Sequence, residues 1–422
     1  MNASSTITSL LDQHVEEAAF LWLLRDKAVH APHYSLADLA ELDERIEAHL
    51  DGLRIAGEAG WEIAKVALRW EQPGEVFTAA VLAFESGQPE WIDTLLAVVT
   101  SQPELSRVLV SALGWLPFKP IANQIDQYLN ISSPQSRYLG LAASAVHRIN
   151  PGTPLDTAIN DPDPILNTRA LRAVGELGRK DRLSQLRSQY LSPDATTRFW
   201  AAWSATLLGE KRENLELLQT YALLPTSPYQ NRALSLLLRS LDLTTATRWL
   251  NTFAQRHPEA PRILTSGLGI VGDPVHLPWL IQQMEIPELA RIAGESFTLI
   301  TGMTLNDNEE NLADEKPANF TAGPTDNPAE DDVALDPDED LLWPNPTLIK
   351  AWWEKHQKQY QPHTRYLLGQ PITPTHCQQV LRNGLQRQRI AAALELTLRQ
   401  PGTPLFETRA PGVWQQQWLK VR

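Results

Sequence analysis

The sequence predicts an all-α protein, a right-handed superhelical solenoid of stacked helix pairs with one acidic loop inserted into it. The main observation is a repeat of about 30 residues that persists for about 200 residues. Each repeat places an arginine at the start of an apolar stretch, with a proline or polar turn before it and a glycine or charged turn after it. The repeat arginines are Arg107, Arg137, Arg169, Arg198, Arg232, Arg262 and Arg291.

Residues 1–102 are predicted to form an N-terminal helical region. Apolar residues at helical spacing indicate a first helix over 8–31. Ser35 is a suitable N-cap for a second helix, which stops at Gly57. Two shorter amphipathic segments follow. We interpret them as irregular or capping repeats, because the terminal unit of an array must present a polar face to water.

The repeat array is predicted over 103–303. In its clearest unit, the turn DPDP at 161–164 precedes the helix ILNTRALRAVGELG, and the second helix RLSQLRSQYL follows a short charged turn. Proline near a helix start costs little, because the first amides have no intrahelical partners. Small residues follow the arginines by four or five positions, where neighbouring helices must approach closely: Ala112, Ala142, Ala173, Ala202 and Gly267.

An acidic segment, 304–342, interrupts the array. Thirteen acidic residues and one lysine lie between Asp307 and Asp340, so this stretch carries almost the whole net charge of −13. It is rich in proline and asparagine and has little apolar periodicity, which is typical of a long mobile loop.

The C-terminal region, 343–422, is predicted to resume the array. One helix starts near Pro346 and another ends at Gly384. Arg389 then leads the apolar stretch IAAALELTL, about three repeat periods after Arg291. The tail from Gly402 departs from the repeat pattern.

The array resembles the HEAT-like repeats, in particular the short class with proline-rich turns. This resemblance implies a helical solenoid, and it leaves two interpretations of the repeat arginines. In the structural one, the stems pack along the stack while the guanidinium groups bind turn carbonyls or carboxylates. In the functional one, a row of cations follows a phosphate backbone, as in some HEAT-like DNA-repair enzymes. The apolar surroundings favour the structural interpretation, and the acidic segment disfavours direct nucleic-acid binding.

The composition fits a cytoplasmic protein. A single cysteine, Cys377, excludes an internal disulfide framework and suits a reducing compartment. The N-terminus has no basic stretch typical of a secretory signal, and no uncharged apolar run is long enough for a membrane span.

No motif indicates an enzyme, a metal site or a cofactor. The nucleophile, phosphate-loop and dinucleotide patterns are absent. His30 and His33, or His376 with Cys377, do not have the spacing of metal ligands. A calcium loop is also absent, because the aspartates at 336–340 lack the required glycine and distal glutamate. A solvated charge run is the simplest interpretation of the acidic segment. Weak cation binding and the engagement of a basic partner are the alternatives.

The candidate partner-binding residues are the acidic ones and two adjacent tryptophans. An acidic strand can imitate nucleic acid in the cleft of a nuclease and speed association. Adjacent tryptophans cannot both be buried on one narrow helix face, so one of them is a candidate interface residue. The candidates are Asp307, Glu309, Glu310, Asp314, Glu315, Glu330, Asp331, Asp332, Asp336, Asp338, Glu339, Asp340, Trp352 and Trp353.

Five stretches resemble a family of bacterial HEAT-like proteins encoded beside type VI secretion genes: SLLDQHVEEAAFLWLLRD, LADLAELDERIEAHLDGLRIAGEAGW, ARIAGESFTLITGM, RYLLGQP and GLQRQRIAAALELTL. The resemblance implies a non-catalytic protein that works with a secreted toxin. The first hypothesis is an immunity protein that binds and neutralises a cognate toxin, for example a nuclease blocked by the acidic segment. The second is an adaptor that loads the effector onto the secretion spike. A HEAT-like DNA glycosylase or a pigment lyase is a third class, which the charge distribution disfavours.

Overall fold

Most of the described residues lie in helices. The structure, a computed structural model, describes residues 3–306, 312–315, 336 and 338–420. Within these residues there are twenty-two α-helices and only two pairs of short strands. The predicted all-α helical repeat fold is therefore confirmed.

The contacts divide the chain into two compact units. The first contains Met1–Asn214, Arg382–Ala393 and Gln400–Arg422, and the second contains Leu215–Leu381 and Leu394–Arg399. Each unit therefore combines repeat helices with segments from the C-terminal part of the chain. The boundaries drawn from the repeat period, near residues 103, 303 and 342, stay predictions.

The first unit begins with two long antiparallel helices, α1 (Ala3–Ala28) and α2 (Leu36–Ala56), which pack on each other. Ser35 caps α2 as predicted. Its side chain accepts from the amide of Asp38, and the Asp38 carboxylate accepts from the amide of Ser35. Gly57, with φ of 58°, ends the helix. The next helix is α3 (Glu58–Ala67).

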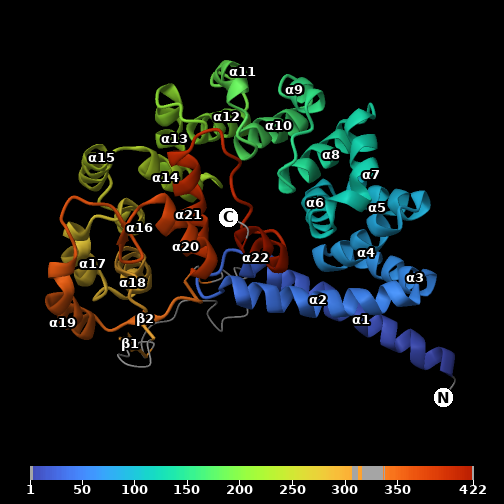
Figure 1. Ribbon diagram of the computed structural model, residues 1–422, viewed down its shortest axis with the longest axis horizontal. Coiled ribbons are helices and arrows are strands. Elements are labelled where there is room, and N and C mark those ends of the chain that lie inside the picture. Colours follow the sequence, from blue (N-terminus) through green and yellow to red (C-terminus); the bar gives the residue numbers. More distant parts are fainter. Residues whose placement is uncertain (1–2, 307–311, 316–335, 337, 421–422) are drawn as a thin grey trace, which may run out of the picture. The chain divides into compact units, whose positions relative to one another are not determined.

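A row of stacked helices follows in the first unit, and each member contacts the next (Figure 1). The row consists of α4 (Pro73–Ser86), α6 (Ser106–Trp115), α8 (Pro134–Val146), α10 (Pro164–Glu176) and α12 (Ala195–Leu207). The second helices of the pairs are α5 (Pro89–Ser101), α7 (Phe118–Asn130), α9 (Thr153–Ala158) and α11 (Leu183–Ser188). Helix α13 (Glu213–Leu223) continues the chain toward the second unit.

The second unit contains a shorter row, in which α14 contacts α16 and α16 contacts α18. These helices are α14 (Gln230–Ser240), α16 (Pro261–Val271) and α18 (Pro287–Thr301). Beside them lie α15 (Leu243–Arg256), α17 (Leu277–Gln283), α19 (Pro346–His356) and most of α20 (Pro374–Asn383). The strands are β1 (Ala313–Asp314) paired with β2 (Trp343–Pro344), and β3 (Tyr366–Leu367) paired with β4 (Gln370–Pro371).

Small residues allow the row helices to approach closely in both units. A Cβ on Gly175 would lie 2.7 Å from Cα of Ser204 on the next row helix, and a Cβ on Gly269 would lie 2.9 Å from Cα of Ser296. Each serine donates a hydrogen bond to a carbonyl of the preceding row helix, Ser204 to Leu171 at 2.7 Å and Ser296 to Thr265 at 3.0 Å. The same local packing therefore recurs along the array.

The last part of the chain returns to the N-terminal helices within the first unit. The amide of Gln386, at the start of α21 (Gln386–Arg399), donates to the carbonyl of Tyr34 at 2.8 Å. The final helix, α22 (Gly412–Lys420), packs on α2, where Gly412 lies so close that a Cβ would be 2.7 Å from Cα of Ala40. No helix among the described residues is long and apolar enough to cross a membrane.

Candidate functional site

The described ends of the acidic segment are held in place beside α18. Strand β1 pairs with β2, and the amide of Asn345 donates to the carbonyl of Leu312 at 2.9 Å. The amide of Leu312 donates in turn to the carbonyl of Leu305 at 2.9 Å, and both leucine side chains are buried. The segment is therefore anchored near its first and its last residues.

Two aspartates of the segment bind repeat arginines directly. Arg291 binds the carboxylate of Asp336 at 2.6 Å, and Arg262 binds the carboxylate of Asp338 through both terminal nitrogens. Arg291 also donates to the carbonyl of Asp338 at 2.7 Å and lies over the ring of Trp343 at 4.7 Å. Asp338 is only 4 % exposed. A solvated charge run was therefore the wrong expectation for Asp338, because its charge is neutralised inside the second unit.

The other described acidic candidates are exposed. Asp314 and Glu315 lie at the end of β1, and Glu339 and Asp340 directly follow the buried Asp338. Six further candidates, Asp307, Glu309, Glu310, Glu330, Asp331 and Asp332, lie outside the described residues. A partner-binding role for the acidic segment stays a prediction.

The two adjacent tryptophans of α19 differ in burial. Trp353 is buried, and Trp352 is half-buried and stacks on His356 with ring centres 4.3 Å apart. Both rings form T-shaped contacts with Phe297 of α18. Trp352 is therefore the member of the pair with surface left for an interface.

Arginines at the repeat position bind groups of the same chain. Besides Arg262 and Arg291, four others bind carboxylates or turn carbonyls, and Arg389 binds glutamine side chains. The contacts are Arg107 to Asp26, Arg137 to Asp161, Arg169 to Glu176, Arg198 to the carbonyls of Ser192 and Pro193, and Arg389 to Gln386 and Gln415. Arg232 is exposed at the start of α14.

The structure brings together a further set of residues that the sequence analysis did not single out. Residues 400–412, here called the strap, contain no helix before Gly412 and run past the C-terminal ends of row helices in the first unit. The amide of Leu405 donates to the carbonyl of Glu176 at 2.9 Å, and Arg148 donates to the carbonyl of Leu405. The strap therefore binds the array through its backbone.

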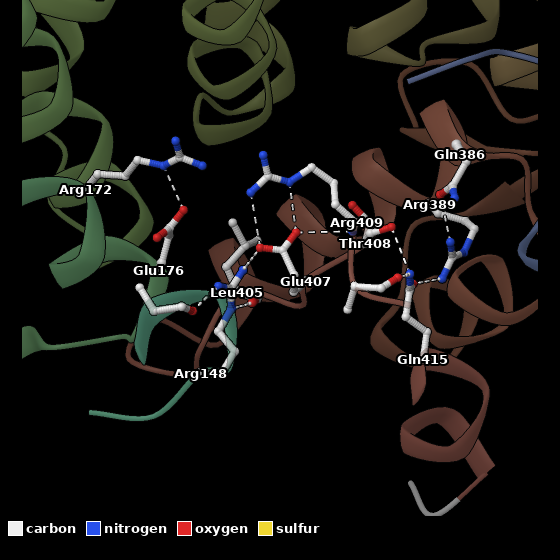
Figure 2. Close-up of polar contacts among 12 residues, drawn as sticks. Arg148, Arg172, Glu176, Gln386, Arg389, Leu405, Glu407, Thr408, Arg409 and Gln415 are labelled. Carbon is white, nitrogen blue, oxygen red and sulfur yellow. Dashed lines mark hydrogen bonds and ion pairs between the residues drawn. The ribbon is translucent and has the colours of Figure 1, made fainter. Parts of the chain in front are cut away.

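Glu407 supplies the side-chain contact between the strap and the array. Figure 2 shows its carboxylate between two arginines, Arg148 of the array at 3.1 Å and Arg409 of the strap at 3.0 Å. Burial alone would raise the pKa of Glu407, but the charges of Arg409 and Arg148 outweigh burial and lower it to about 2. Glu407 is thus ionised at neutral pH and accepts hydrogen bonds, which suits binding rather than proton donation.

Glu176 and Arg172 lie beside this group (Figure 2). The Glu176 carboxylate accepts from Arg169 at 2.9 Å and from Arg172 at 2.7 Å. Burial alone would raise the pKa of Glu176, but the positive charges of Arg169 and Arg172 have the larger effect and hold this pKa well below the usual range. The backbone carbonyl that receives the strap thus belongs to a residue whose side chain is fixed by ion pairs.

The far end of the strap is bound by the N-terminal helices. Arg25 of α1 donates to the carbonyls of Arg409 at 2.8 Å and Ala410 at 3.1 Å. Asp43 of α2 accepts from Arg25 at 2.8 Å and from the amide of Gly412 at 2.7 Å. This buried pair therefore clamps the strap just before α22 begins.

Gln415 of α22 links the strap to α21. Its amide group donates to the carbonyls of Thr408 at 3.0 Å and Ala410 at 2.6 Å, and its oxygen accepts from Arg389 (Figure 2). Arg389 is fully buried, and burial lowers its pKa to about 10. Arg389 opens a helix as the repeat arginines do, but here it helps to position the strap.

The histidines and the cysteine do not form a recognisable reactive centre. Cys377 is buried, and burial raises the pKa of its thiol to about 11, so it is a thiol at neutral pH. The neighbouring His376 binds the carbonyl of Leu367 through Nε2. No group of three or more histidine, cysteine, aspartate or glutamate residues in the described part of the chain could hold a metal ion.

A scan against models of known protein families and a search of curated proteins found no match to this chain.

Proposed function

We propose that this protein is a non-catalytic scaffold that binds a basic protein partner through its acidic segment, and that the partner is a type VI secretion toxin which it neutralises. The observation that carries this proposal is the binding of Asp336 and Asp338 by Arg291 and Arg262. These contacts fix part of the acidic segment on two neighbouring repeat helices.

The fixed aspartates support the proposal because exposed carboxylates directly adjoin them. Glu339 and Asp340 follow Asp338, and Asp314 and Glu315 lie on or beside β1, which β2 holds. Charged groups on an anchored backbone lose less conformational freedom when a partner binds. A concentrated negative field also attracts a basic protein and raises the rate of association.

The state of the buried ionisable groups supports a non-catalytic role. Glu176 and Glu407 are held ionised by arginines, and Cys377 is held as a thiol. None of the three is poised for acid–base or nucleophilic chemistry near neutral pH. The resemblance to proteins encoded beside type VI secretion genes supports a secreted toxin as the class of partner.

The test neutralises exposed acidic residues of the segment. In the variant Glu315→Gln, Glu339→Gln, Asp340→Asn, we expect weaker protection of cells that express the cognate toxin. We also expect the complex to become less sensitive to salt, because fewer exposed charges contribute to its formation.

A matched control neutralises the same number of exposed acidic residues on α1 and α2: Asp12→Asn, Glu16→Gln, Glu44→Gln. It should protect as the wild-type chain does. Equal protection by both variants would contradict the role of the acidic segment. If cells that lack this protein survive expression of the effector but no longer secrete the effector, the protein is an adaptor and not an antidote.

A further inference from the structure

The strap is bound as a peptide ligand would be bound. Most of its contacts with the rest of the first unit are made by its backbone: the amides of Leu405 and Gly412, and the carbonyls of Leu405, Arg409 and Ala410. Backbone contacts supply affinity for an extended segment largely independently of its sequence. The receiving groups are Arg25, Asp43, Arg148 and Glu176, which with Gly178 and Gly209 we call the helix-end ridge.

One side chain of the strap is recognised specifically. The Glu407 carboxylate is buried against Arg148 of the ridge at 3.1 Å. A charge-assisted hydrogen bond of this kind depends on the identity of the residue. An extended segment with another side chain at this point would leave Arg148 in the buried site without this carboxylate partner, which is costly.

Two glycines of the ridge leave room for the strap. Gly178, with φ of +71°, follows α10, and a Cβ there would lie 2.4 Å from the carbonyl oxygen of Gly402. A Cβ on Gly209, after α12, would lie 3.1 Å from the ring of Pro401. Gly152 also has a positive φ, of +70°, but nothing lies within 4 Å of its Cβ position. Gly178 and Gly209 follow row helices and lie against the strap, whereas Gly152, the N-cap residue of α9, does not touch it.

The same mode of binding occurs independently in the second unit. The amide of Tyr366 donates to the carbonyl of Gly272 at 2.8 Å, and the amide of Leu368 donates to the carbonyl of Leu299 at 2.7 Å. A Cβ on Gly272 would lie 2.4 Å from the carbonyl oxygen of Tyr366. The ends of the row helices thus receive an extended segment in both units, which indicates a general property of these repeats.

We propose that the helix-end ridge of the first unit is a peptide-binding site, occupied by residues 400–412 of the same chain, which accepts in trans an extended peptide with a glutamate facing Arg148. Vacating the ridge leaves Arg25, Asp43 and Arg148 without the strap groups that they bind. The empty ridge therefore favours rebinding of an equivalent peptide. This site is separate from the acidic segment and does not rest on its proposed role.

The test uses the whole chain with a protease site inserted between Arg399 and Gln400, both of which are exposed. After cleavage, a fluorescent peptide of residues 400–422 is added in excess, and its binding is followed by anisotropy. We expect saturable uptake of the labelled peptide, competed by the unlabelled peptide, while the helical circular dichroism signal is retained.

Variants of the peptide test the recognition of Glu407. Glu407→Gln should weaken binding by about 10- to 100-fold, the loss typical of a buried charge-assisted contact. The control Gln417→Ala changes an exposed residue of α22 and should bind within about 2-fold of the wild-type peptide.

Variants of the helix-end ridge distinguish two effects on peptide binding: the steric clash of a new methyl group with the strap, and the strain of a positive φ. Gly178→Ala and Gly152→Ala impose the same unfavourable φ, but only the first places a methyl group against the strap. Gly178→Ala should weaken peptide binding by at least about 10-fold relative to Gly152→Ala.

Three results would overturn the proposal. The first is equal binding by the Glu407→Gln and wild-type peptides, and the second is equal binding by the two glycine variants. The third is a cleaved chain that never exchanges its fragment for the labelled peptide, or that loses its helical circular dichroism signal when the fragment leaves. In either case the strap would be part of the hydrophobic core and not an exchangeable ligand.

Discussion

Glu407 and Arg148 are 259 positions apart in the sequence, yet their side chains form an ion pair at 3.1 Å inside the first unit. Glu407 belongs to the strap, and Arg148 follows row helix α8. Their pairing joins the end of the chain to the array, and Arg409 and the carbonyl of Leu405 complete the contact (Figure 2). Within the first unit, the array is therefore bound by a part of the chain that does not follow the repeat pattern.

The Glu407 carboxylate should make the stability of the first unit depend on pH. Its pKa is lowered from 4.5 to about 2 by the arginines, so its contribution is complete above pH 4.5 and is lost as the pH falls toward 2. Glu407→Gln should lower the free energy of unfolding by about 3 kcal/mol near neutral pH. Urea unfolding followed by tryptophan fluorescence measures this difference.

The pH series provides the internal control for this variant. The gap between wild-type and Glu407→Gln unfolding free energies should narrow as the pH falls below 4.5, because the wild-type carboxylate becomes protonated in the unfolded chain first. A gap that stays constant down to about pH 3 would show that the variant acts through packing and not through charge.

Gly272→Ala should destabilise the second unit more than Gly152→Ala destabilises the first. The two glycines have nearly the same φ, 72° and 70°, so the backbone strain, about 1 kcal/mol, is common to both changes. Only the Cβ on Gly272 would meet a backbone atom, the carbonyl oxygen of Tyr366 at 2.4 Å. Chemical unfolding of both variants measures the difference, and similar losses would contradict the close approach.

Asp338→Asn should release the described ends of the acidic segment. The change removes a carboxylate that pairs with Arg262, while the amide keeps nearly the same size. Hydrogen exchange at the amides of Leu312 and Asn345 should become faster, since both residues directly flank the β1–β2 strand pair and their amides are hydrogen-bonded there. Glu339→Gln alters an exposed neighbour and serves as the control. Unchanged exchange in Asp338→Asn would mean that the ion pair does not anchor the segment.

His147 should add a second pH dependence in the mildly acidic range. Burial lowers its pKa below 6.5, only partly offset by its hydrogen bond to the carbonyl of Leu113. The unfolded chain therefore takes up its proton first, and the stability contributed by neutral His147 is lost as the pH falls through 6.5. Between about pH 7.5 and 5.5, wild type should lose more stability than His147→Asn. Parallel losses would exclude this assignment.

The sequence predicted the helices well because their signals are local. Ser35 with Asp38 forms the capping box that starts α2, and Gly57 ends it. Proline marks the start of α10 at residue 164 and of α19 at residue 346. Each of these features depends on residues within one or two helical turns.

The conformations of the strap and of the anchored part of the acidic segment were not predicted, because they are set by residues that are distant in the sequence. The strap has no apolar periodicity of its own, and its backbone is fixed by Glu176, Arg148 and Arg25. The binding of Asp338 by Arg262 likewise joins positions 76 residues apart. The departure of the tail from the repeat pattern was the one sequence signal, and it marked the strap without indicating where it binds.

The interaction free energy between the side chains of Arg148 and Glu407 tests whether the array binds the end of its own chain through specific contacts. It is measured by a double-mutant cycle with Arg148→Met, Glu407→Gln and both together, from unfolding free energies near neutral pH. We expect the double variant to be more stable than the sum of the two single losses implies, by about 1 to 3 kcal/mol. Additive losses would contradict it.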